Sequence, residues 1–327
     1  MDLRWELETR KEKVEEYLEN IFDPIVQANL RAAMEHLPNA GGKRLRPICA
    51  MLACELAGGS IHEVMPFGVA LELIHNFTLV HDDIMDEDDL RRGTPTVHTV
   101  FSIPTAINAG NGLHSHAFDI VTRSNCSHST FRRLVREMAV TVRAIGEGQQ
   151  DDIDFENRDD VTVEEYFRMI ENKTAKIFEM AFRGAALISG ASEEAVSALG
   201  EFGMNFGISF QLSDDHLDVV SLSRELGKPS KSDLKKNKKT LIIVTAFEKA
   251  GPTEREILGR VLGNQSATEE ALNRAADVLV KLGSVDQARM EAEQYAERAK
   301  RSLDYFPPSA AKEILEALAD YNITRKY

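Results

Sequence analysis

Two short aspartate clusters constrain this chain more than any other feature. The first runs from Asp82 to Asp86 and the second from Asp214 to Asp218, and each reads Asp-Asp-x-x-Asp. On a helix, the first and last aspartates of each cluster lie four residues apart and share one face. Carboxylates held this close repel one another unless cations lie between them. The pattern predicts two facing clusters that bind Mg²⁺ or a similar ion, with coordination positions left for phosphate oxygens.

Apolar residues recur at three- and four-residue steps along nearly the whole chain, as in Val14, Tyr17, Leu18 and Ile21. This spacing is typical of amphipathic helices, whereas strand-like alternation is absent. Short glycine- and proline-containing breaks separate the helical stretches. We therefore predict an all-α helical bundle that forms a single domain over residues 1–327.

Two long helices are expected to carry the clusters near their carboxyl-terminal ends. One is predicted from Pro66 to Leu90 and the other from Ser192 to about Val220. The lysine-rich stretch from Gly227 to Lys239 interrupts the helical pattern without the composition of a domain linker.

The charge balance argues against general nucleic-acid binding. Lys and Arg total 39 against 53 Asp and Glu, a formal net charge of -14, so the surface is not diffusely basic. Residues 1–20 lack the apolar core of a targeting peptide, and no run is expected to cross a bilayer. The 3 cysteines, Cys49, Cys54 and Cys126, cannot all pair, which favours a reducing cytoplasm.

Cations accompany the acidic clusters. Arg91 and Arg92 follow the first cluster and offer guanidinium forks that match phosphate oxygens. Upstream, the segment from Gly41 to Pro47 (GGKRLRP) places cations on a glycine-opened turn before a helix start. This segment is either a metal-free phosphate pocket or a solvated basic loop.

Further polar side chains stand at positions that the clusters make informative. Lys173 and Thr174 lie in a helical stretch, and Gln211 precedes the second cluster on its predicted metal face. Lys228 and Lys238 belong to a loop that could close over a substrate. Taken alone, residues of this kind more often belong to the surface or the core.

Two other metal chemistries fit less well. His75 and His81 precede the first cluster, but a metal phosphohydrolase would need further His and Asp ligands elsewhere. The segment from Asp82 to Gly93 lacks the alternate-position ligands, central glycine and closing glutamate of a calcium loop.

Taken in order, these motifs closely resemble the trans-isoprenyl diphosphate synthases, or polyprenyl synthetases. They are GGKRLRP at 41–47, His75, DDIMD at 82–86, RRG at 91–93, Gly148-Gln149, Lys173-Thr174, FQLSDDHLD at 210–218, Gly227-Lys228 and Lys238. The resemblance spans residues 41–240. It implies an all-α bundle around a deep central cavity, usually a homodimer, that joins an allylic diphosphate to isopentenyl diphosphate.

The resemblance also implies residue roles. Several Mg²⁺ ions on the allylic diphosphate would be held by Asp82, Asp86 and Asp214, supported by Asp83, Asp215 and Asp218. The same diphosphate would contact Arg91, Lys173, Thr174, Gln211, Lys228 and Lys238. Isopentenyl diphosphate would occupy the metal-free pocket with Lys43, Arg46, His75 and Arg92. The residues expected to matter most for catalysis are Asp82, Asp86, Asp214, Lys173 and Lys228.

Product length is expected to depend on the helix that precedes the first cluster. Phe77 lies five residues before Asp82, about 7.5 Å along a helix axis, where its ring is either a floor for the growing chain or an ordinary core aromatic. Ile74 lies lower on nearly the same face. Thr78 stands where short-chain farnesyl enzymes place a second aromatic. These residues look like archaeal-type geranylgeranyl diphosphate synthases, which implies a twenty-carbon product, with farnesyl and longer products as alternatives.

The chain departs from the family pattern in places. Gly110-Asn111-Gly112 stands where Gly-Asp is usual, and His114 and His116 follow in a segment that is normally more apolar. For these two histidines we favour positions near a subunit or cavity surface. Asn237 replaces a glycine, which is tolerable because asparagine adopts the left-handed conformation.

Two alternative classes are weighed. A terpene cyclase would replace the second aspartate cluster with an Asn/Ser/Glu-type motif and lack the GGKRLRP segment. A non-catalytic regulatory subunit would typically lose one cluster, and this chain keeps both.

Overall fold

The structure is a computed structural model that describes residues 2–220 and 231–325. Its contacts divide the chain into two compact units. The first unit comprises Met1–Ala139, Met180–Gly200 and Leu303–Ala317, and the second comprises Val140–Glu179, Glu201–Ser302 and Leu318–Tyr327. The unit boundaries fall inside or between helices, and the single-domain organisation stays a prediction.

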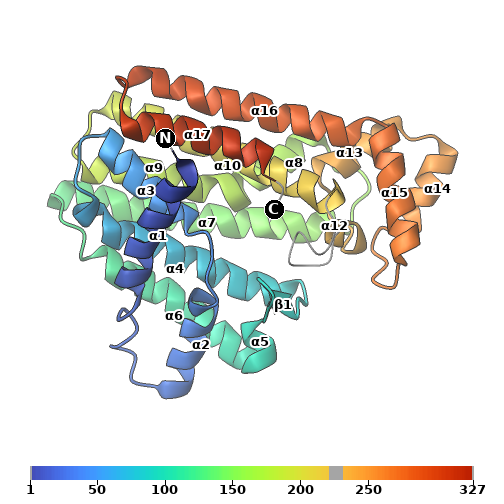
Figure 1. Ribbon diagram of the computed structural model, residues 1–327. Coiled ribbons are helices and arrows are strands. Elements are labelled where there is room, and N and C mark those ends of the chain that lie inside the picture. The colour runs from blue at the N-terminus through green and yellow to red at the C-terminus, as the bar shows by residue number, and fades with distance from the viewer. Residues whose placement is uncertain (1, 221–230, 326–327) are drawn as a thin grey trace. The chain divides into compact units, whose positions relative to one another are not determined.

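Nearly all regular structure in the described residues is helical, which confirms the all-α prediction (Figure 1). The elements up to residue 121 are α1 (Leu3–Leu18), α2 (Ala28–Asn39), α3 (Leu45–Leu56), α4 (Ile61–Met85), β1 (Leu90–Arg91), β2 (Thr94–Pro95), α5 (Val97–Val100) and α6 (Ile103–Val121). The next are α7 (His128–Phe155), α8 (Val163–Ile170), the π-helical turn η1 (Glu171–Ala175), α9 (Lys176–Ile188) and α10 (Glu193–Val220). The last are α12 (Ser232–Lys235), α13 (Leu241–Lys249), α14 (Pro252–Gly259), α15 (Glu269–Lys281), α16 (Ser284–Ser302), the 3₁₀ turn η2 (Leu303–Tyr305) and α17 (Ala310–Thr324).

Helix α4 forms the centre of the first unit, where it packs against α3 and α6 (Figure 1). It is the one helix in the described ranges long and apolar enough to cross a membrane, contrary to the expectation that no run reaches that length. Within the protein, 72% of its most apolar window is buried. A helix that is apolar on all sides and buried in this way has the character of a core helix.

The carboxyl-terminal end of α4 is set by a Schellman motif directly after the first aspartate cluster. Glu87 adopts a left-handed conformation with φ 54°. The Asp88 N–H donates to the Asp83 carbonyl at 2.9 Å, and the Glu87 N–H donates to the Ile84 carbonyl at 3.4 Å. This pattern satisfies carbonyls that the helix end would leave unpaired. The helix therefore ends at Met85, earlier than the predicted Leu90.

In the second unit, α8, α10, α13, α15 and α16 share one hydrophobic core. Tyr166, Leu212, Ile242, Leu279 and Ala288 are among its buried members. Helices α14 and α15 form the orange hairpin of Figure 1. Because α10 begins at Glu193 and ends at Val220, the predicted second long helix is confirmed within one residue at its start.

Close helix packing in the second unit depends on glycines of α10. A Cβ at Gly203 would lie 2.7 Å from the Phe178 carbonyl oxygen and 2.9 Å from the Glu179 Cα. These are backbone atoms, so the neighbouring helix cannot yield by turning a side chain. By contrast, a Cβ at the exposed Gly146 of α7 would meet nothing within 4 Å.

We expect Gly203→Ala to lower the free energy of unfolding by about 1–3 kcal/mol, because the added methyl group overpacks the α9–α10 contact. The matched variant Gly146→Ala should raise it by up to about 1 kcal/mol through better helix propensity alone. Urea denaturation followed by circular dichroism measures both. Equal effects of one sign would contradict the packing account.

Candidate active site

The first aspartate cluster presents a mixture of accessible and buried carboxylates. Asp82 and Asp86 are partly exposed, whereas Asp83 is buried at 1% relative exposure. The Arg91 guanidinium donates to Asp83 Oδ1 from Nε at 2.8 Å and from Nη2 at 2.5 Å. Burial raises the pKa of the Asp83 carboxyl, and the charge of Arg91 opposes that shift. Arg91 therefore stabilises the cluster by pairing with its buried carboxylate, Asp83.

The two strands β1 and β2 form a short hairpin that presents Arg92. Its two turn residues, Arg92 and Gly93, both have positive φ, 55° and 74°, as a type I′ turn requires. A non-glycine residue in this conformation is uncommon. The Arg92 guanidinium donates from Nη1 to the Gly41 carbonyl, and a Cβ at Gly42 would lie 2.9 Å from that nitrogen. The hairpin thus packs against the basic segment, and the phosphate pocket there stays a prediction.

His75 belongs to the same group of residues. Burial lowers the pKa of its imidazole well below the ordinary value, and the charges of Arg46 and Arg92 lower it further. His75 is therefore neutral at physiological pH and can donate one hydrogen bond and accept another. Lys43 is exposed and Arg46 is partly exposed.

A buried arginine that sequence reasoning left without a role anchors the basic segment. Arg44 has φ 49° and a relative exposure of 2%. Its guanidinium donates to Glu15 at 2.8 Å, to Glu72 at 2.9 Å and to the Pro38 carbonyl at 2.5 Å. These bonds connect α1, α4 and the end of α2 to the segment that carries Lys43.

The predicted chain-length residues lie on α4 among aromatic rings of α6. The Phe77 ring centroid lies 5.1 Å from that of His81 and 5.2 Å from that of His114, which in turn lies 5.2 Å from Phe118. Ile74 is buried on the same helix. His114 is therefore a half-buried neighbour of Phe77, and burial lowers the pKa of its imidazole.

Thr78 and His116 have different surroundings. The Thr78 hydroxyl donates to the His75 carbonyl of its own helix at 2.8 Å. His116 is buried, with Nε2 2.7 Å from the Ile21 carbonyl and its ring 5.7 Å from that of Phe22. His116 thus connects α6 to the segment that follows α1 and has a packing role.

The second aspartate cluster, in the second unit, shows the same mixture. Asp214 is partly exposed and receives a hydrogen bond at 2.5 Å from Arg325, whose guanidinium also stacks 4.2 Å from the Phe210 ring centroid. Asp218 is buried and accepts hydrogen bonds from the Ser232 hydroxyl at 3.0 Å and the Asp233 N–H at 3.2 Å. These last bonds attach the start of α12 to the cluster.

Asp215 is fully engaged inside the protein. The Tyr166 hydroxyl donates to Oδ2 at 2.6 Å, and the Gln211 amide donates to Oδ1 at 2.7 Å. Burial raises the pKa of Asp215 to about 7, while the two donors favour its ionised form. The Thr174 hydroxyl donates to the side-chain oxygen Oε1 of Gln211 at 2.8 Å, so the chain of hydrogen bonds reaches η1. Two predicted site residues, Thr174 and Gln211, are thereby brought together.

Lys173 and Lys238 are also brought together, by Asp152, a residue the sequence reasoning missed. Their ammonium groups lie 2.6 Å and 2.9 Å from the same carboxylate oxygen, Oδ2. The one available signal was that Asp152 follows Gly148-Gln149 at helical spacing. Lys228 lies outside the residues that the structure describes.

The aspartate clusters suit magnesium by the chemistry of their donors, which are carboxylate oxygens throughout. Asp83 Oδ2 is buried without a hydrogen-bond partner among residues 2–220 and 231–325. Within those ranges, no group of three or more His, Cys, Asp or Glu side chains is arranged to hold a metal ion by itself. An ion at either cluster would therefore take further ligands from a substrate or from water.

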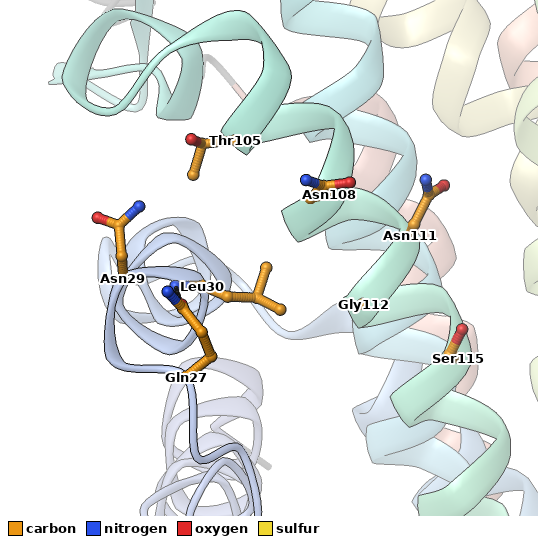
Figure 2. A pocket seen from close by; sticks show the side chains of 8 residues that line it. All are labelled: Gln27, Asn29, Leu30, Thr105, Asn108, Asn111, Gly112 and Ser115. Atoms are coloured by element: carbon orange, nitrogen blue, oxygen red, sulfur yellow. Dashed lines mark hydrogen bonds between the residues drawn. The ribbon is translucent and has the colours of Figure 1, made fainter.

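A separate pocket of about 470 Å³ lies between α2 and α6 in the first unit (Figure 2). Amide side chains of Gln27, Asn108 and Asn111 line it, and the residues predicted to bind diphosphate do not. Asn111, which departs from the family pattern, is exposed at this pocket.

Known proteins resemble the chain along nearly its whole length. Residues 27–279 match the family model described as Polyprenyl synthetase. A geranylgeranyl diphosphate synthase of Methanosarcina mazei is 39% identical over 327 residues, which cover 100% of this chain and 99% of that protein. A geranylfarnesyl diphosphate synthase of Aeropyrum pernix is 39% identical over 311 residues, covering 93% and 96%. The solved geranylgeranyl pyrophosphate synthetase of Geoglobus acetivorans has a TM-score of 0.90 at 39% identity, covering 98% and 99%.

The chain combines a helical architecture with two aspartate clusters, each of which has an arginine in contact with one of its carboxylates. With a match of this extent, the chain belongs to the polyprenyl synthetase family. The family resemblance stated from the motifs is thereby confirmed.

Tyr166→Phe should destabilise the protein by about 1–3 kcal/mol, because it removes one hydrogen bond to the buried Asp215 carboxylate. The exposed Tyr305 provides the control, and Tyr305→Phe should change the free energy of unfolding by no more than about 0.5 kcal/mol. Chemical denaturation of both variants measures the difference. If Tyr166→Phe is as harmless as the control, Asp215 does not depend on this donor.

Proposed function

We propose that this protein is a magnesium-dependent geranylgeranyl diphosphate synthase, which transfers an allylic chain head to tail onto isopentenyl diphosphate. As a polyprenyl synthetase, it is a trans-prenyltransferase. The observation that carries the proposal is the pair of intact aspartate clusters on long helices, in a chain that matches geranylgeranyl diphosphate synthases along its full length.

Magnesium fits the first and last aspartates of the motifs better than the middle ones. Asp82, Asp86 and Asp214 are partly exposed, so we propose that they bind the ions. Asp83, Asp215 and Asp218 are buried and hydrogen-bonded, so we assign them supporting roles. When bound, Mg²⁺ would neutralise charge on the allylic diphosphate as it becomes a leaving group.

The protein's own cations would bind the two diphosphates. For the allylic diphosphate we propose Arg91, Lys173, Thr174, Gln211, Lys228 and Lys238. For isopentenyl diphosphate we propose Lys43, Arg46, His75 and Arg92, a group supported by the contact between Arg92 and the Gly41 carbonyl and by the effect of both arginines on the pKa of His75. Arginine forks and ammonium groups both suit phosphate oxygens.

The reaction then needs positioning and charge stabilisation without a protein nucleophile. The bond between C1 of the allylic chain and its diphosphate oxygen breaks, and the electron pair leaves with the diphosphate. The double bond of isopentenyl diphosphate attacks C1, and the released diphosphate accepts the proton lost from the new chain. The side chains hold both substrates in line and exclude water from the carbocation.

A twenty-carbon product is supported by the ring cluster around Phe77. His114 of α6 packs on Phe77, and Phe118 of the same helix packs on His114. These contacts restrict rotation of the Phe77 ring. A floor fixed in this way would stop elongation. The geranylfarnesyl diphosphate synthase among the relatives keeps a longer product as the alternative.

We propose that the protein is a homodimer, supported by exposed Val100, Ile103 and Ile107 at α5 and α6. Light scattering of the purified chain tests this oligomeric state.

We also propose a cytoplasmic location, supported by Cys49, Cys54 and Cys126, which are all free thiols.

Asp82→Asn should lower the elongation rate by about a hundredfold or more, because the substituted amide is a poor ligand for the ions that stabilise the leaving diphosphate. Asp89→Asn, three residues beyond the cluster and exposed, should leave the rate unchanged. Incubation with isopentenyl diphosphate and each allylic primer in Mg²⁺, followed by product sizing, gives the rates. Cyclised terpenes without elongation would identify a cyclase instead.

Phe77→Ala and His114→Ala should each lengthen the product by at least one five-carbon unit, because each opens the space that the ring cluster closes. His116→Ala removes a histidine from the same helix, but its ring faces the Ile21 carbonyl, so the product should stay the same length. Chromatography of the dephosphorylated products decides. If Phe77→Ala leaves the product length unchanged, Phe77 does not limit chain elongation.

A further inference from the structure

We infer that Asp152 is a positioning residue, which holds Lys173 and Lys238 side by side so that both ammonium groups meet one diphosphate. The inference rests on the proposed function. Asp152 comes from α7, Lys173 from η1 and Lys238 from the segment between α12 and α13. Both lysines donate to the single oxygen Oδ2, at 2.6 Å and 2.9 Å, so their charges are close neighbours.

The charges explain why the carboxylate is needed. The two ammonium groups repel each other because both contact the same oxygen. Lys238 is also nearly buried, with 10% of its side chain exposed. Burial alone would raise the pKa of Asp152, but the two lysines hold it below its ordinary value, so the carboxylate stays ionised. Glu156 adds a bond to Lys238 at 2.7 Å. Asp152 contacts both lysines through the same oxygen.

The backbones that carry the lysines are fixed independently of Asp152. A Cβ at Gly148 would lie 2.4 Å from the Lys173 backbone nitrogen, so α7 and η1 are in direct contact. Asn237, left-handed at φ 57°, donates its side-chain amide to the Glu156 carbonyl at 2.5 Å, directly before Lys238. What Asp152 determines is therefore where the two ammonium groups point.

This arrangement suits a diphosphate better than a single carboxylate or a water molecule. A diphosphate offers several charged oxygens on two linked phosphorus atoms, and neighbouring ammonium groups can each bind one of them.

Asp152→Asn tests the inference because it removes the charge and keeps the shape. Its matched control is Asp151→Asn, which removes the same charge one residue earlier, where the carboxylate faces Arg168 at 3.8 Å. We expect Asp152→Asn to raise the KM for the allylic diphosphate about tenfold or more, while the KM for isopentenyl diphosphate changes little. The dissociation constant of farnesyl diphosphate alone, from calorimetry, should rise equally. Asp151→Asn should change none of these values.

A double variant separates positioning from folding. If Asp152 acts through the lysines, its effect on the KM should shrink in the Lys238→Gln background. D152N leaves two ammonium groups without their shared carboxylate, and the double variant D152N/K238Q removes one of them. The double variant can therefore be measured if D152N alone fails to fold. Equal rises in both KM values, or additive effects in the double variant, would overturn the inference.

Failure of the proposed function is distinguishable from failure of this inference. If the unmodified protein elongates no allylic primer, the proposed function is wrong. Binding of inorganic pyrophosphate to the unmodified protein and to Asp152→Asn then decides about the lysine pair alone. Tighter binding by the unmodified protein supports the pair as a diphosphate site, and equal binding overturns it.

Discussion

Burying a carboxylate is unfavourable unless donors or cations surround it, and this constraint organises the site-bearing parts of both units. Asp83 has Arg91, Asp152 has two lysines, and Asp215 has Tyr166 and a glutamine amide. Apart from Gln211, which lies on the same helix as Asp215, these partners come from other elements than the acid they contact, so each buried acid also fixes the packing of its neighbours. The two lysines keep Asp152 ionised, whereas burial raises the pKa of Asp83 and of Asp215 in spite of their partners. The same bonds that stabilise the fold thus keep the charges where the chemistry needs them.

Much of the helical fold was readable from the sequence because its signals are local. Apolar spacing placed the start of α10 within one residue and predicted α4 five residues too late at both ends. The errors at α4 have physical causes. The apolar pattern predicts a start at Pro66, yet the helix begins five residues earlier, at Ile61, and contains Pro66 in its second turn without the hydrogen bond that an N–H would donate to the His62 carbonyl. The carboxyl-terminal end of α4 is set by Glu87 in the left-handed conformation. The sequence does not indicate this end, because glutamate rarely adopts that conformation.

Part of the site's arrangement could be predicted from the sequence. The motifs group Arg92 with the GGKRLRP segment and Thr174 with Gln211, and in the structure the members of each group are in contact. The partners of the charged residues were not readable, because they depend on tertiary contacts between positions far apart in sequence. Arg325 lies 111 residues from Asp214, and Asp152 lies 86 residues from Lys238. The contact of His114 with Phe77 is also a tertiary contact between different helices, so the position of His114 in the sequence did not indicate it.

The π-helical turn η1 carries a consequence for how the site tolerates changes in length. Helices α8 and α9 run into it from either side without a break, so the three elements form one continuous rod with an extra residue in its middle. Loss of a single residue, such as Asn172, would let the rod close into a regular α-helix. The flanking helices would keep their faces, because the widened turn accommodates the extra residue locally. Lys173 and Thr174 lie in that turn, so their contacts with Asp152 and Gln211 would be lost, and a deletion that spares the helix would disconnect the chemistry.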